Sequence, residues 1–67
     1  MKVYRIHRFG GLIREITGKE IDLLKWIQNN VPAQIKAGFR TGDPSNNKEL
    51  LYGDARAAGI TINSKVI

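Results

Sequence analysis

The side chains that could take part in catalysis are few and lie far apart in this chain of 67 residues. The chain has no cysteine and one histidine, His7, which excludes a thiolate nucleophile, a disulfide and a site with several histidine ligands. Arg8 follows His7 directly, and a neighbouring cation disfavours the imidazolium form. The six acidic residues show no close pair suited to general acid–base work. We therefore expect a protein that is not an enzyme and that holds neither a metal ion nor a cofactor.

Basic side chains offer a different chemistry, because eleven Lys and Arg against six Asp and Glu give a net charge of +5. The excess is local: residues 1–14 contain cations and no acid, and residues 31–42 repeat this pattern. Clustered cations with aromatic residues nearby are typical of surfaces that contact phosphates. The candidate nucleic-acid contacts are the side chains able to carry positive charge: Arg5, His7, Arg8, Arg14, Lys36, Arg40 and Lys48.

A β-hairpin is expected to position the first of these cations. Residues 2–9 and 12–17 are rich in β-branched and aromatic types, and the two glycines between them can supply the positive φ of a primed turn. A two-residue loop at these glycines pairs Phe9 with Leu12. A helix that extends backwards to Leu12 is the competing interpretation.

The expected register decides which side chains share a face of the hairpin. It places Arg5, His7 and Arg14 together, with Phe9 and Tyr4 near enough for stacking on bases. A two-stranded ribbon of this kind can enter a major groove, where arginine reads guanine. The simpler alternative is that Arg5 and Arg14 pair with nearby glutamates and cover the core with their stems.

The main helix is expected over residues 18–30. Thr17 and Glu20 have the spacing of a capping box. The apolar stripe that would face the core consists of Leu23, Leu24, Ile27 and Val31.

Trp26 suggests a rival function. It lies at the margin of the apolar stripe, near Lys19 and Asp22, and tryptophan is enriched at protein interfaces. These three residues predict a small protein-binding modulator or inhibitor of host machinery, encoded by a phage or mobile element, that meets an acidic protein surface. In the simpler interpretation, Trp26 only fills space at the edge of the core.

The second half of the chain predicts a loop, a shorter helix and a strand. Residues 32–47 are rich in glycine and polar types. Asp43 followed by Pro44 matches an N-cap and a first helical residue, so a helix is expected over 44–58, ended by Gly59. Apolar and polar residues then alternate over 60–66, which predicts a closing strand that pairs with the hairpin.

Together these elements predict one small α+β domain over residues 1–67, with an antiparallel sheet made from the N-terminal hairpin and the C-terminal strand. The sheet packs against one main helix and a shorter second helix. The favoured function is a regulatory protein that binds nucleic acid without catalysis, with DNA favoured over RNA. A ribosome-associated or other RNA-binding protein is a third option.

Location and assembly follow from the same features. No apolar run approaches the roughly 20 residues needed to cross a bilayer, and residues 1–8 lack a signal-peptide core. We therefore expect no membrane partner and a cytoplasmic protein. The closing strand is an edge at which two copies could form a homodimer.

Overall fold

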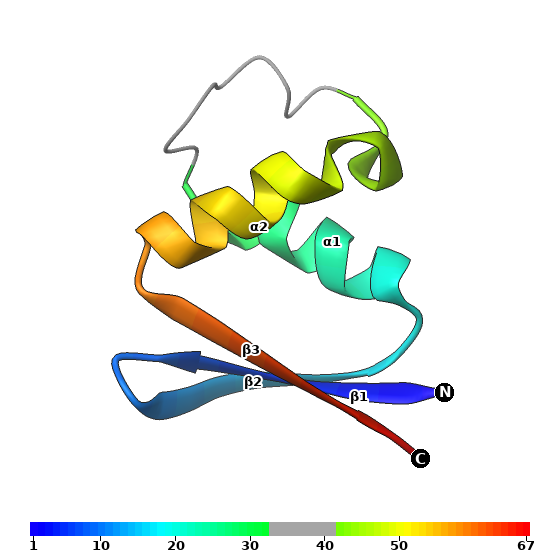
Figure 1. Ribbon diagram of the computed structural model, residues 1–67, viewed down its shortest axis with the longest axis vertical. Helices are drawn as coiled ribbons and strands as arrows, with labels where there is room; N and C mark the ends of the chain where they lie inside the picture. Colours follow the sequence, from blue (N-terminus) through cyan, green and yellow to red (C-terminus); the bar gives the residue numbers. More distant parts are fainter. Residues whose placement is uncertain (33–41) are drawn as a thin grey trace.

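Three strands and two α-helices make up the part of the chain that the computed structural model describes, residues 1–32 and 42–67. Figure 1 shows both helices on one side of the sheet. The predicted α+β architecture, an antiparallel three-stranded sheet with two helices, is confirmed. In chain order the elements are β1 (Lys2–Arg8), β2 (Gly11–Gly18), α1 (Glu20–Asn30), the 3-10 turn η2 (Pro44–Asn47), α2 (Lys48–Ala57) and β3 (Ile60–Val66).

The first strand, β1, lies in the centre of the sheet, in the order β2-β1-β3 with both pairings antiparallel. Tyr4 and Ile6 point from β1 towards the helices and are buried. Ile16 and Ser64 lie opposite Tyr4 on the two outer strands. The closing strand thus pairs with the first strand of the hairpin and leaves its own far side as a sheet edge.

The hairpin turn differs from the expected one. Arg8 pairs with Gly11, so the loop residues are Phe9 and Gly10, and both have positive φ, at 50° and 85°. Positive φ at both loop residues is the pattern of a type I′ turn. The expected loop at the two glycines is therefore wrong, because Phe9 accepts the left-handed conformation and Gly11 becomes the first residue of β2.

A β-bulge then changes the register a second time, between Ile6 and His7 on β1. Beyond the bulge the pairing is one residue away from the expected register, and a shift of one residue moves every side chain of a strand to the other face. As a result Ile16 packs against the core. Burial of this isoleucine is the physical reason to prefer the observed register, because the expected one leaves it on the opposite face.

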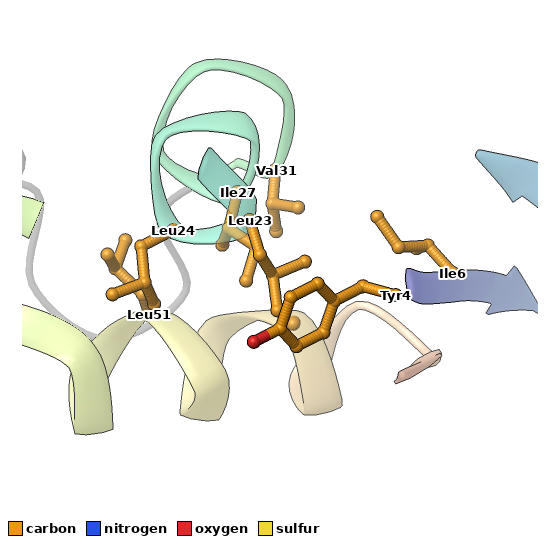
Figure 2. Packing of buried hydrophobic residues seen from close by; sticks show 8 residues of the cluster. Tyr4, Ile6, Leu23, Leu24, Ile27, Val31 and Leu51 are labelled. Atoms are coloured by element: carbon orange, nitrogen blue, oxygen red, sulfur yellow. The ribbon is translucent and has the colours of Figure 1, made fainter. Parts of the chain in front are cut away.

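The core lies between the sheet and the two helices (Figure 2). The apolar stripe predicted on the main helix is confirmed. Leu51 and Ala55 of α2 pack against it and complete the core. Full burial of one such leucine or isoleucine side chain stabilises the fold by roughly 1.5–3 kcal/mol. The buried apolar residues are Tyr4, Ile6, Leu23, Leu24, Ile27, Val31, Leu51 and Ala55.

Helix α1 begins later than expected and uses a different cap. Thr17 remains in β2, and the N-cap residue is Lys19, whose backbone N–H donates to Asp22 Oδ2 at 3.1 Å. The predicted cap by Thr17 and Glu20 is therefore wrong, because the strand continues through Gly18. Glu20 is free of the capping role and contacts α2 instead.

The C-terminal elements follow the prediction closely. Asp43 caps the turn as expected, with Oδ1 accepting from the Ser45 N–H at 2.9 Å. The first turn is a 3-10 turn, and α2 continues from it to Ala57. Gly59 follows the end of α2, as expected, and its φ is 78°. Within the described residues, neither helix has the length and apolar character needed to cross a membrane.

Candidate nucleic-acid interface

The face of the sheet that points away from the helices is the strongest candidate for a binding surface. Both described helices lie on the other face (Figure 1). Alternation along β1 places Val3, Arg5 and His7 on this outer face, because Tyr4 and Ile6 point inward. Their partners lie on the outer face with them: Thr17, Glu15 and Leu12 on β2, and Lys65, Asn63 and Thr61 on β3.

A shallow hollow of about 170 Å³ lies on this face between β1 and β3. Arg5 opposite Asn63, and Lys65 opposite Val3, form its sides. The pairing of β1 with β3 thus brings Arg5, near the start of the sequence, close to Lys65, near its end. Arginine can contact guanine with two hydrogen bonds, asparagine can do the same with adenine, and lysine binds phosphate as a point charge.

Arg5 also pairs with a glutamate across the hairpin, as the simpler alternative predicted. Its Nε donates to Glu15 Oε2 at 3.2 Å, and both side chains are exposed. An exposed ion pair contributes about 0–1 kcal/mol. A phosphate or a base edge could therefore replace the carboxylate at small cost.

His7 lies at the bulge, opposite Leu12. Its ring is half-buried, and among the described residues no group hydrogen-bonds the buried Nδ1 atom. A buried polar atom without a partner costs about 1–3 kcal/mol. This histidine therefore lies on the predicted face but is more enclosed than the arginines around it.

The hairpin tip carries an exposed aromatic ring. Phe9 is 83 % exposed, and the guanidinium carbon of Arg8 lies 5.4 Å from the centre of its ring, within range of a cation–π interaction. The predicted role of Tyr4 in stacking is wrong, because Tyr4 is 5 % exposed and forms part of the core. Phe9 remains the candidate for contact with a base.

The structure separates some of the predicted contacts. Arg14 lies opposite Ile6, so the expectation that it shares a face with Arg5 is wrong, and the cause is the register change at the bulge. Lys48 lies on α2 and its Nζ is 3.5 Å from Glu20 Oε1. The predicted contacts Lys36 and Arg40 lie outside the described residues.

The contacts predicted from the sequence do not include the residues that β3 contributes, Thr61, Asn63 and Lys65. Their alternation with Ile60 and Ile62 was visible in the sequence and did predict a strand. The pairing of β3 with β1, which places them beside Arg5, is a long-range contact that no local pattern encodes.

Trp26 packs at the edge of the core and is half-buried, as the simpler interpretation predicted. Lys19 and Asp22, its proposed partners at an interface, form the cap of α1. A role of these three residues in binding a protein stays a prediction.

A polar cluster on the helix side joins α1 to α2. The Tyr52 hydroxyl donates to Glu20 Oε2 at 2.8 Å, and this hydrogen bond is the main reason why the pKa of Glu20 is lowered from its ordinary value of 4.5, with a further contribution from Lys48. Burial, followed by the bond to Glu20, raises the pKa of Tyr52 well above its ordinary value of 10.0.

This cluster borders a groove of about 470 Å³ that runs between the helices and the inner side of β1 and β3. The groove contains one carboxylate, that of Glu20, beside the cations Lys2 and Arg56. In the described ranges, no three His, Cys, Asp or Glu side chains gather closely enough to hold a metal ion. The carboxylate already accepts hydrogen bonds from two side chains, which suits a structural role.

The fold defines the class of this protein as a small α+β domain with an antiparallel sheet, one face of which the described helices leave uncovered. Comparison with protein-family models, with curated proteins and with solved structures finds no match for this chain.

Proposed function

We propose that this protein binds nucleic acid, with duplex DNA as the favoured partner, through the outer face of its sheet. The observation that carries the proposal is the hollow in which Arg5, Asn63 and Lys65 meet. These are the residue types that read bases and hold phosphates. The net charge of +5 attracts the phosphate backbone over longer distances.

The dimensions of the sheet support this mode of binding. Neighbouring strands lie about 4.8 Å apart, so the backbones of the three strands, in the order β2-β1-β3, span about 10 Å. This width is comparable with that of the major groove, roughly 12 Å. Arg5 and Asn63 would then point towards base edges, and Lys65 towards a phosphate. Phe9 at the hairpin tip would be available to stack on an exposed base.

The test is a salt titration of binding to mixed duplex DNA, single-stranded DNA and structured RNA, over about 50 to 200 mM salt. The double variant Arg5→Ala/Lys65→Ala should bind duplex DNA more weakly, and the slope of log affinity against log salt should flatten by up to about 2. Circular dichroism of the variant would show that the fold is retained.

A matched control removes the same charge from the other face. The variant Lys2→Ala/Arg14→Ala loses two exposed cations whose strand positions face the helix side. It should change the salt slope much less than the outer-face variant does. Equal effects of the two variants would show that only the total charge matters and would overturn the assignment to this face. Absence of binding to all three nucleic acids at low salt would direct the search to a protein partner at Trp26.

A further inference from the structure

Among residues 1–32 and 42–67, no strand pairs with the outer edge of β3, which presents its backbone groups in a defined order. At the two ends of the β1–β3 ladder, the Ile67 N–H donates to Met1 O at 3.2 Å and the Phe9 N–H donates to Gly59 O at 3.5 Å. In an antiparallel ladder, residues that face the partner strand alternate with residues that face away. The backbone groups that point out of the sheet from this edge are therefore those of Ile60, Ile62, Ser64 and Val66.

The two edges of the sheet differ in how well they resist the addition of another strand. Strand β2 begins and ends with glycine, contains the bulge, and carries the adjacent charges Arg14 and Glu15. Such features protect an edge. Strand β3 has no glycine, proline or bulge, and Lys65 is its one charged residue. Strand addition is therefore expected at β3.

We propose that two copies of this chain form a dimer by antiparallel pairing of β3 with β3, with the two-fold axis at Asn63. In this register, Ile60 of one copy lies opposite Val66 of the other, and Ile62 lies opposite Ser64. Every outward-pointing backbone group then meets an outward-pointing group of the second copy, as an antiparallel ladder requires.

The side chains of β3 are also self-complementary in this register. On the outer face, Lys65 of one copy lies opposite Thr61 of the other, so no two like charges meet. On the inner face, Ile60 meets Val66, which is 70 % exposed in the single chain. The dimer would remove part of this apolar surface from water.

The groove on the helix side leaves room for this pairing. Ile60, Ile62 and Ser64 line it from β3, and Tyr52 and Arg56 line it from α2. A strand added to β3 would bring the inner-face side chains of the second copy to this groove. The dimer would also join the two outer faces into one surface of six strands. At about 4.8 Å between strands this surface is wider than one major groove, so entry into the groove would require the single chain. The inference does not depend on nucleic-acid binding.

The first experiment is sedimentation equilibrium of the full chain without nucleic acid, over about 10 μM to 1 mM protein. The expected result is a mean mass that rises with concentration towards twice that of one chain. A mass that stays at one chain throughout would overturn the proposal and leave the β3 edge to an extended segment of another protein.

The variant Ser64→Pro tests whether the outer edge of β3 is the interface. Proline removes the N–H that would donate to Ile62 of the second copy, while the β1–β3 ladder does not use this N–H. We expect Ser64→Pro to sediment as a single chain. The matched variant Ser64→Ala keeps the N–H and should dimerise like the natural chain. A folded Ser64→Pro chain that still dimerises would overturn the proposal.

A charge exchange tests the register and does not depend on how well proline is tolerated. Thr61→Lys places a lysine opposite Lys65 of the second copy at two symmetric positions, which should weaken the dimer by about 2- to 30-fold. The double variant Thr61→Lys/Lys65→Glu replaces both repulsions with opposite-charge pairs and should restore the dimer. If Thr61→Lys has no effect, or if the second change does not restore pairing, this register is wrong.

Discussion

The hydrogen bond from Tyr52 to Glu20 should contribute to stability within a limited pH range, and Tyr52→Phe should remove that contribution. The bond joins α2 to the first turn of α1 with an oxygen–oxygen distance of 2.8 Å. A hydrogen bond to a charged group contributes about 1.5–3 kcal/mol when shielded from water. The Glu20 side chain is 43 % exposed, so we expect a loss of about 1 kcal/mol at neutral pH.

The pH range follows from the two pKa shifts. Because the pKa of Glu20 is lowered in the folded protein, mainly by the Tyr52 hydroxyl, its stabilising effect is full above its ordinary pKa of 4.5. That effect is lost as pH falls through the folded pKa. Because the pKa of Tyr52 is raised, by burial first, its effect is full below its ordinary pKa of 10.0 and is lost as pH rises towards the folded pKa.

Urea unfolding followed by Trp26 fluorescence measures the difference in unfolding free energy between the natural chain and Tyr52→Phe. The difference should be about 1 kcal/mol near pH 7 and should shrink near pH 3 and near pH 11. The variant Glu20→Gln keeps the shape without the charge, so it should lose the acid-side dependence. A difference near zero at pH 7, or one that persists at pH 3, would refute the reasoning.

Four further substitutions test the fold. Gly18→Ala should destabilise the protein by about 1–3 kcal/mol in urea unfolding, because its Cβ would lie 2.6 Å from the capping oxygen of Asp22. Gly10→Ala is strained by its positive φ of 85° but its Cβ meets nothing within 4 Å, so it should cost less than Gly18→Ala; the reverse order would contradict this. Phe9→Asn should raise the unfolding free energy by about 0.5–1 kcal/mol, because asparagine suits the first loop position of a type I′ turn; a lower unfolding free energy would mean that the ring contributes to stability. Leu51→Ala should cost about 2–5 kcal/mol and lower the thermal midpoint followed by circular dichroism, and an unchanged midpoint would show that the contact of α2 with α1 is not part of the core.

The elements of this fold could be predicted because each has a local signature. The apolar stripe of α1 repeats at the helical period. The Asp43-Pro44 pair marks the start of the second helix. Alternation marks β3. These signals depend on residues within one or two turns of each other, so the sequence alone is sufficient to read them.

The arrangement of the candidate site could not be predicted in the same way. The face on which Arg14 lies depends on the β-bulge between Ile6 and His7, which no local sequence pattern marks. The neighbours of Arg5 on β3 lie near residue 63, and their pairing arises from the packing of the whole sheet. The contact of Glu20 with Tyr52 likewise depends on how α2 crosses α1.

The position of β1 in the centre of the sheet has a consequence for folding kinetics. Its pairing with β3 joins Lys2 to Val66, which are almost the whole length of the chain apart. Closing so long a loop costs conformational entropy before the hydrogen bonds of the β1–β3 ladder can stabilise the chain. A large share of contacts between residues distant in sequence therefore slows folding. On a ribosome the hairpin and α1 would emerge first, with one edge of β1 still unpaired. Ile60–Val66 would then complete the sheet after all the other described elements have been synthesised.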